Sequence, residues 1–206
     1  MARRQVRLVA FDLDGTLLRG ATVCEVLAER FGKLDRMRAI EQLRDIADIS
    51  AARQEMLNWY GDVPAEELCG DLQRMEIAPG AAEAFELLTS CGVPTVIISV
   101  TWSFAVEWFA RRLGAEAWVG TTLTAAGSID HFWPHDKPTW LSQYASKLGV
   151  ELAEVAAVGD SHGDIPMLAK VGYPVFVGKQ LPHQIGHALH KPQANLLEIA
   201  EIILAA

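Results

Sequence analysis

Two aspartates that are two residues apart, Asp12 and Asp14, lie in the stretch FDLDGTLL near the start of the chain. They follow a short, mostly apolar run at 6–11, which is typical of a buried parallel strand. Like charges there repel each other, which points to a compensating cation or to chemistry. One carboxylate could attack a phosphorus atom, and the other could transfer protons. Asp-Gly is also a common turn pair, so the two aspartates could instead be turn formers at the end of the strand.

Further polar residues follow later apolar runs, where other parallel strands would end. Ser99 closes the run VIIS, and Asp160 and Asp164 lie in GDSHGD directly after VAAV. Lys137 precedes a predicted helix that leads into this last strand. Because the carboxyl ends of parallel strands meet at one edge of a sheet, we expect these residues to converge with Asp12.

A structural role is the alternative for each of these later residues. Ser99 could be an ordinary strand-end serine, with Thr101 as the rival phosphate ligand. Asp160 could cap the following helix, and Lys137 could be a surface lysine. As a group, the carboxylates would repel one another until a hard divalent cation joined them, and Mg²⁺ prefers oxygen ligands. With one lysine added, the pattern predicts an acidic, metal-bearing pocket that suits a phosphate group.

Alternating strand and helix patterns surround these residues and predict an α/β fold, a doubly wound, Rossmann-like parallel sheet with helices on both faces. Strands are predicted at 6–11, 94–99, 154–160 and 173–178, with a strand and hairpin over 116–133 that turns near Ala126-Gly127. Helices are predicted at 81–92, 103–114, 138–149, 164–172 and 193–206. The helical spacing of 22–32, 34–48, 50–61 and 64–75 makes 21–75 a helical block without a clear strand.

Composition restricts the class of protein. The 206 residues are 50% hydrophobic and 21% charged, which fits one globular domain or one domain with a modest insertion. The formal net charge of −8 argues against nucleic-acid binding, which depends on Lys and Arg. Scattered cysteines without metal-ligand spacing favour free thiols in a reducing cytoplasm. The apolar runs are too short for a signal peptide or for the roughly 20 residues of a membrane span, so we expect a cytoplasmic protein that does not bind membranes.

At four places the sequence resembles the haloacid dehalogenase-like (HAD) phosphatases. DLDGTLL, the serine that ends VIIS, the lysine in HDKPTW and GDSHGDIPML match the four motifs of that superfamily in order and approximate spacing. SVTWSFAVEWFARRLG is similar to the corresponding segment of its phosphoserine-phosphatase-like branch. The resemblance covers nearly the whole chain. It implies a HAD-like core of residues 1–18 and 76–206, with a small helical cap of residues 19–75 inserted after the first strand.

The resemblance also implies catalytic roles for three residues. Asp12 would be the nucleophile that forms an aspartyl-phosphate, and Asp14 would be the general acid and base. Lys137 would bind the transferring phosphoryl group and steady Asp12. Mg²⁺ would be held by a carboxylate oxygen of Asp12, by the main-chain carbonyl of Asp14 and by Asp160.

Supporting roles are implied for the residues around them. Ser99 would bind the phosphoryl group together with the backbone amides of Val100 and Thr101. Asp164 would orient metal-bound waters or Lys137. Within the first motif, the hydroxyl of Thr16 is suited to holding the loop.

The chain departs from true phosphoserine phosphatases at positions that contact their substrate. Ala21 stands where they carry a glutamate for the substrate ammonium group, and Met56 stands where they carry an arginine for its carboxylate. Val100 and Thr101 replace two glycines that follow the motif serine. We therefore expect hydrolysis, but of a substrate other than phosphoserine.

The sequence as a whole predicts a Mg²⁺-dependent phosphomonoesterase that acts on a small phosphorylated metabolite beneath a closing cap, with Arg53 as a candidate donor to an anionic part of the substrate. A phosphomutase or phosphotransferase would use the same aspartyl-phosphate. A regulatory protein that binds a phosphate ligand without useful turnover is the non-enzymatic alternative. Elsewhere, His183, His187 and His190 are spaced to share one helical face, which could bind a transition metal or face solvent.

Overall fold

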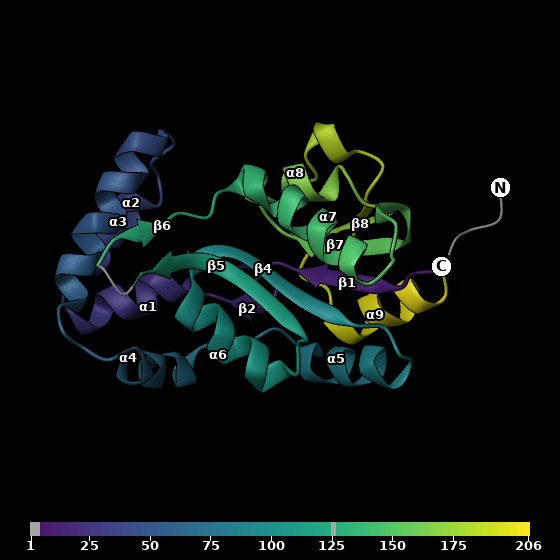
Figure 1. Cartoon of the computed structure of the whole chain (residues 1–206), viewed down its shortest axis with the longest axis horizontal. Helices are drawn as coiled ribbons and strands as arrows, with labels where there is room; N and C mark the ends of the chain where they lie inside the picture. The colour runs from purple at the N-terminus through teal and green to yellow at the C-terminus, as the bar shows by residue number, and fades with distance from the viewer. Residues whose placement is uncertain (1–4, 125–126) are drawn as a thin grey trace.

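A mostly parallel sheet forms the centre of the computed structural model, which describes residues 5–124 and 127–206 (Figure 1). Its seven strands within the described residues are β1 (Leu8–Phe11), β4 (Thr95–Trp102), β5 (Ala117–Leu123), β6 (Ile129–Asp130), β7 (Val155–Gly159), β8 (Tyr173–Phe176) and β9 (Leu189–His190). They run in the order β6-β5-β4-β1-β7-β8-β9, and all neighbouring pairs are parallel except β5 and β6. The first strand of the chain therefore lies in the middle of the sheet.

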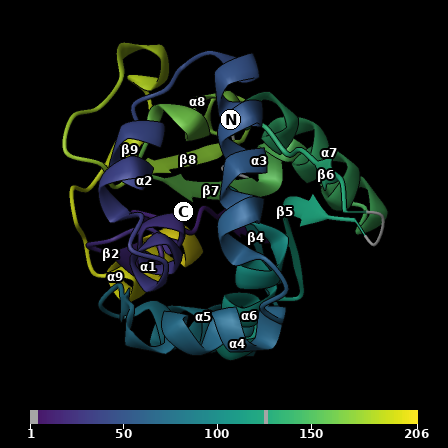
Figure 2. The same cartoon turned by 90° about the vertical axis from the view of Figure 1, so that its left-hand side faces the viewer.

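Helices cover both faces of this sheet (Figures 1 and 2). One face carries α5 (Ala81–Ser90), α6 (Ser103–Leu113) and α9 (Leu196–Leu204), and the other carries α7 (Lys137–Lys147) and α8 (Ile165–Leu168). Side chains alternate accordingly along β1, where Val9 and Phe11 join the core of the first face and Leu8 and Ala10 join that of the second. Burial on both sides explains the continuous apolar runs of the strands. The predicted doubly wound α/β fold is confirmed.

Four helices lie between two short strands that leave and rejoin the core. β2 (Leu18–Arg19) pairs antiparallel with β3 (Glu76–Ile77), a ribbon that the sequence pattern did not reveal. Between them come α1 (Val23–Arg30), α2 (Leu34–Ile40), α3 (Ile46–Tyr60) and α4 (Ala65–Asp71). α4 packs against both α1 and α6, whereas α2 and α3 stand in front of the carboxyl ends of the sheet strands (Figure 2).

The single helix predicted over 34–48 is wrong, because the chain ends one helix and begins another within it. α2 ends at Ile40, and Asp45 caps the N-terminus of α3. The carboxylate of Asp45 accepts hydrogen bonds from the backbone amides of Ala47 and Asp48. An aspartate that binds amides ahead of it starts a helix more readily than it continues one. As a result, α3 begins before the predicted segment 50–61, and the connection at 41–45 lies free of both helices.

Two predicted elements change length near the polar residues of interest. The strand predicted at 94–99 continues as β4 to Trp102, which pairs with Thr121 of β5, so Ser99 lies within a strand and not at its end. The helix predicted at 164–172 shrinks to α8, because a 3₁₀ turn at His162–Asp164 precedes it and the chain returns to the sheet at Tyr173. Of the predicted turn at Ala126-Gly127, Ala126 lies outside the described residues.

The interpretation of three histidines as one helical face is also wrong. His183 begins a short 3₁₀ turn that ends at Ile185, and His190 lies in β9, where its Nε2 contacts the carbonyl of Gly178 at 2.9 Å. The pairing of β9 with β8 requires an extended backbone at this point, which removes the helical spacing.

Within the described part of the chain, no helix combines the length and apolar character needed to cross a lipid bilayer.

Candidate active site

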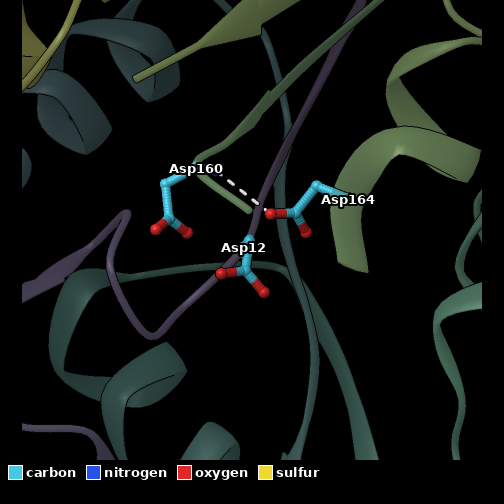
Figure 3. Close-up of side chains that lie close together, drawn as sticks. All are labelled: Asp12, Asp160 and Asp164. Carbon is cyan, nitrogen blue, oxygen red and sulfur yellow. Dashed lines mark hydrogen bonds between the residues drawn. The ribbon is translucent and has the colours of Figure 1, made fainter. Parts of the chain in front are cut away.

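Three aspartates meet at the carboxyl edge of the sheet, where β1 and β7 end (Figure 3). Asp12 follows β1, Asp160 follows β7, and Asp164 closes the 3₁₀ turn that comes next. The carboxylate oxygens that the three can offer lie within 4.8 Å of one another. The neighbours of β1 are β4 on one side and β7 on the other, so the strands that follow in the sequence are added first on one side of β1 and later on the other. Ligand sites of doubly wound folds form at such switch points.

Lys137, the first residue of α7, lies between two of these carboxylates. Its Nζ donates hydrogen bonds to Oδ1 of Asp12 and to Oδ1 of Asp164, both at 2.7 Å. The residue is only 2% exposed. Burial lowers the pKa of Lys137, but the charges of Asp12 and Asp164 outweigh this effect, so its pKa lies above the ordinary value. Lys137 is therefore a fixed cation inside the molecule, and the alternative of a surface lysine is excluded.

Asp164 uses both carboxylate oxygens within the chain. Its Oδ1 accepts from Lys137, and its Oδ2 accepts from the amides of Asp160 and Ser161, both at 3.1 Å. The dashed line in Figure 3 marks the hydrogen bond from Asp160. The hydroxyl of Ser161 adds a further hydrogen bond to Oδ2 at 3.2 Å. These contacts fix the loop that presents Asp160 and hold the lysine in place.

The aspartates carry more negative charge than one lysine neutralises. Burial and the charge of Asp164 raise the pKa of Asp12 well above its ordinary value. Burial, again with Asp164, raises the pKa of Asp160 to about 6. A divalent cation beside these carboxylates would relieve the repulsion, and carboxylate oxygens are hard ligands that suit such an ion. The donor set therefore fits a divalent metal.

The loop after β1 passes unusually close to Asp160. Gly15 has a φ of +84°, and a Cβ atom at this position would lie 2.2 Å from Oδ2 of Asp160. Glycine is the residue that tolerates both this backbone conformation and this approach. Thr16 is fully buried, and its Oγ1 donates a hydrogen bond to Oδ1 of Asp160 at 3.3 Å. The hydroxyl of Thr16, which was predicted to hold the loop, thus contacts the carboxylate of Asp160 across the site.

Asp14 lies against the beginning of α1. Its Oδ1 accepts a hydrogen bond of 2.8 Å from the backbone amide of Val23, the first residue of that helix. Burial raises the pKa of Asp14 to about 7. A carboxyl group with such a pKa can both donate and accept a proton near neutral pH.

The predicted phosphate-binding residues on β4 are engaged with one another. The buried hydroxyl oxygen of Ser99 accepts a hydrogen bond of 3.3 Å from the amide of Thr101. The Thr101 hydroxyl lies 3.5 Å from the sulfur of Cys24. The carbonyl of Val100 accepts a hydrogen bond of 3.0 Å from the hydroxyl of Thr121. To bind a phosphate group, the amide of Thr101 would therefore have to give up its hydrogen bond to Ser99.

A cavity of about 380 Å³ extends from Asp14 beneath α2 and α3. Its apolar lining consists of Met37, Ile40, Leu43, Ile49, Met56, Val100 and Trp102. Its polar lining consists of Asp14, Thr22, Cys24, Glu41, Arg53, Thr101 and Ser161. The cavity thus joins the candidate acid-base residue to a largely apolar space.

Sequence reasoning did not single out Cys24 and Glu41, although both line this cavity. Neither residue belongs to a motif, and which helix faces which strand depends on the fold of the whole segment. Helical spacing could identify an apolar side of α2 that includes Met37 and Ile40, but the same spacing serves a core as well as a cavity.

Arg53 joins α3 to the core. Its Nη2 donates to the carbonyl of Val100 at 2.9 Å and more weakly to that of Phe132 at 3.4 Å. Its Nη1 contacts Nδ1 of His131 at 3.0 Å, and its guanidinium group lies 4.5 Å from the ring centre of Trp133. The arginine lines the cavity, yet most of its hydrogen-bonding capacity is used within the chain.

Tyr60 forms a second attachment of α3 to the core. The indole nitrogen of Trp102 donates a hydrogen bond of 2.9 Å to the hydroxyl of Tyr60. The two rings meet edge to face, with 5.9 Å between their centres. Both side chains are buried, so Tyr60 packs between α3 and β4. Trp102 also lines the cavity.

Together, the fold and the site define the chain as an α/β protein with a buried lysine among aspartates at the carboxyl edge of its sheet. A family model described as haloacid dehalogenase-like hydrolase matches residues 9–169. The chain belongs to this family, and the predicted relationship to its phosphoserine-phosphatase-like branch is confirmed, as is the prediction that it is a phosphatase by class.

Curated relatives are phosphoserine phosphatases. SerB2 of Mycobacterium tuberculosis is 28% identical over 184 residues, which cover 84% of this chain but only 44% of that relative, so the chain spans less than half of its length. The phosphoserine phosphatase of Methanocaldococcus jannaschii is 23% identical over 181 residues, which cover 84% of this chain and 85% of that relative.

Solved structures show the same fold. A substrate-bound phosphoserine phosphatase complex is 21% identical and superposes with a TM-score of 0.79, covering 97% of this chain and 99% of that one. A HAD family hydrolase from Salmonella enterica is 19% identical and superposes with a TM-score of 0.82, covering 98% of this chain and 72% of the other. The helical segment between β2 and β3 lies within these matched regions.

Proposed function

We propose that this chain is a Mg²⁺-dependent phosphomonoester hydrolase that acts on a small phosphorylated metabolite through an aspartyl-phosphate intermediate. The observation that carries the proposal is the position of Asp12, which directly follows the central strand and has the Nζ atom of Lys137 at 2.7 Å and Asp160 beside it. Relatives named phosphoserine phosphatases support phosphate ester chemistry. Their substrate is not carried over to this chain, because Met56 lines the cavity as an apolar residue and Ala21 is exposed.

In the first half of the proposed reaction, a carboxylate oxygen of Asp12 attacks phosphorus. The bond between phosphorus and the ester oxygen breaks, and Asp14 donates its proton to that oxygen. In the second half, Asp14 removes a proton from a water molecule whose oxygen attacks phosphorus. The bond to Asp12 then breaks and inorganic phosphate is released. A pKa of about 7 lets Asp14 serve in both halves.

The other residues of the site would position the phosphoryl group. Lys137 would hold it next to Asp12, and Ser99 would bind it together with the amides of Val100 and Thr101. Asp12, Asp160 and the main-chain carbonyl of Asp14 would hold Mg²⁺. When bound, the ion would neutralise negative charge on the phosphoryl oxygens and on the carboxylates.

We further propose that residues 19–75 act as a cap on a core formed by residues 1–18 and 76–206. The antiparallel β2–β3 ribbon supports this division, because both ends of the helical segment leave the core at one place. The cavity between this segment and the core supports it as well. Cys24, Cys69 and Cys91 are free thiols, which is consistent with action in the cytoplasm.

The test is phosphate release from a panel of phosphorylated metabolites and an aryl phosphate. We expect turnover that is lost when EDTA removes divalent metal and restored when Mg²⁺ is added. Asp12→Asn should lower turnover by at least about 1,000-fold, because the amide is a poor nucleophile. Asp62→Asn, a matched change at an exposed position, should leave it unchanged. Wild-type turnover by Asp12→Asn would contradict the proposal.

The same assay separates the alternatives. If added alcohols or sugars receive the phosphoryl group faster than water does, the chain is a phosphotransferase that uses the same intermediate. If no compound on the panel is turned over, the regulatory alternative is favoured and the proposed hydrolase is refuted.

A further inference from the structure

The cavity next to Asp14 restricts which alcohol groups the substrate can carry. This inference rests on the proposed function. We propose that the substrate is the phosphate monoester of an amino alcohol with an apolar body, and that Glu41 contacts its ammonium group. Asp14 is the proposed proton donor to the ester oxygen. The alcohol part must therefore lie on the side of Asp14 where the cavity opens.

The walls of the cavity favour an apolar body. Met37, Ile40 and Met56 are buried and present aliphatic or thioether side chains to this space. Leu43 and Ile49 extend the same surface. A hydroxylated or highly polar alcohol would lose its hydrogen bonds to water here without gaining equivalent partners, whereas a hydrocarbon chain gains free energy from burial.

Glu41 is a charged group of this cavity wall that forms no direct ion pair within the described residues, although the charge of Arg38 acts on it from nearby. Its Oε1 accepts a hydrogen bond of 2.6 Å from the hydroxyl of Thr22. It takes part in none of the ion pairs formed between residues of the described ranges, and the nearby Arg38 pairs with Glu25 instead at 3.3 Å. A half-buried carboxylate without a direct ion pair is stabilised when a ligand supplies an ammonium group at hydrogen-bond distance.

The cavity also disfavours an anionic substituent. Asp14 and Glu41 both contribute carboxyl groups to its lining. Among the described lining residues, Arg53 alone carries a permanent positive charge, and three of its contacts go to the carbonyls of Val100 and Phe132 and to His131. A carboxylate on the substrate would therefore meet the like charges of Asp14 and Glu41 beside an arginine that is already largely engaged within the chain. This inference competes with the expectation that Arg53 donates to an anionic part of the substrate.

A matched series of substrates tests the inference without any mutation. Hexyl phosphate, aminohexyl phosphate and the hexyl phosphate that ends in a carboxylate differ only in the charge at the far end of the chain. With wild-type protein and Mg²⁺, we expect kcat/KM for the amine to exceed that of the neutral ester by about tenfold or more, as for a hydrogen bond to a charged group. The carboxylate ester should fall below the neutral one.

Glu41→Gln identifies the residue responsible. It should remove the advantage of the amine, mainly through KM, so that kcat/KM for the amine and for the neutral ester come within about twofold of each other. Glu66→Gln, at an exposed position on α4, is the control and should preserve the preference. The neutral ester also reports whether each variant is folded and active.

The outcomes separate this inference from the function on which it rests. Turnover of all three esters with equal kcat/KM, or with a preference for the carboxylate, would overturn the inference and leave the hydrolase intact. An amine preference that persists in Glu41→Gln would overturn the role of Glu41. Failure to hydrolyse any ester or any metabolite on the broader panel would overturn the proposed function and the inference together.

Discussion

Gly15 lets the loop after β1 pass against the carboxylate of Asp160, and this contact can be tested by adding one methyl group. In Gly15→Ala, the Cβ atom would collide with Oδ2 of Asp160, and the left-handed backbone would cost about 1–2 kcal/mol. We expect lower stability in urea together with weaker Mg²⁺ binding by calorimetry, because Asp160 must move.

Gly92→Ala provides the control for this change. Gly92 has a similar φ of +72°, with no atom within 4 Å of an added Cβ. Gly92→Ala should lose only the stability that the left-handed backbone costs and keep the Mg²⁺ affinity of the wild type. If Gly15→Ala also bound Mg²⁺ as tightly as the wild type, Asp160 would not be a ligand held by this contact.

A second prediction for single residues concerns the reactivity of Cys24. Burial raises the pKa of its thiol to about 12, so only about one thiol in 10,000 is ionised at pH 8. Because the thiolate is the reactive form, iodoacetamide should label Cys24 far more slowly than the exposed Cys91, with a rate that rises about tenfold per pH unit. Peptide mapping by mass spectrometry measures both rates. Equal rates in the native protein would contradict the burial of Cys24, whereas equal rates in denaturant are expected.

Motif chemistry explains why some site residues could be predicted from the sequence and others could not. Asp12, Asp160 and Lys137 are of types that phosphate chemistry requires, and each follows or precedes a recognisable strand, so their convergence could be inferred. Glu41 and Cys24 have no such local signal, because their place in the cavity depends on how α1 and α2 pack over the sheet.

At the scale of elements, α3 is held to the core through two side chains on one helical face, Arg53 and Tyr60. Arg53→Gln would remove the hydrogen bond to Val100 and the contact with Trp133. We expect amide hydrogen exchange in α3 to become about 10- to 100-fold faster, because hydrogen bonds to charged groups contribute about 1.5–3 kcal/mol. Hydrogen exchange with mass spectrometry measures this change.

Gln54→Ala, at the neighbouring exposed position, is the control and should not change exchange in α3. Exchange in α7 should stay the same in both variants, because α7 packs on a face of the sheet against β4 and α8, whereas α3 lies at the carboxyl ends of the strands. Unchanged exchange in Arg53→Gln would mean that Arg53 does not hold α3 in place.

Helices and strands were predicted correctly where the hydrophobic pattern was strong and no local hydrogen bond favoured a different structure. The strands beside β1 have continuous apolar runs and were found with small errors at their ends. The break between α2 and α3 was missed, because the helical spacing continues across 41–45 while the local bonds of Asp45 start a new helix. β4 was predicted too short, because Ser99 and Thr101 interrupt its apolar run, whereas in the structure Trp102 still pairs with Thr121 of β5.

At the scale of the whole molecule, metal binding should appear as added stability. A ligand that binds only the folded state at 100 times its Kd stabilises that state by about 2.7 kcal/mol. Excess Mg²⁺ should therefore raise the Tm of the wild type, whereas NaCl at matched ionic strength should not. Asp160→Asn should abolish the shift. A Tm that Mg²⁺ does not change in the wild type would contradict the proposed metal site.

The overall fold was predictable because alternation of strands and helices allows few arrangements. Covering a parallel sheet on both faces places every strand end at one edge, and the motifs then identify which strands are central. The depth and lining of the cavity were not predictable in the same way. They depend on contacts such as that between Tyr60 and Trp102, which join residues that no local pattern relates.

The central position of β1 has a consequence for the growing polypeptide. A ribosome makes β1 first, yet its two neighbours in the sheet, β4 and β7, are made much later. Until Val155–Gly159 emerges, the backbone N–H and C=O groups along one edge of β1 have no partner strand, and Asp12 lacks its neighbour Asp160. Nascent chains should therefore need protection by chaperones until residue 159 has been translated and has left the ribosome, and the acidic site should be among the last features to form.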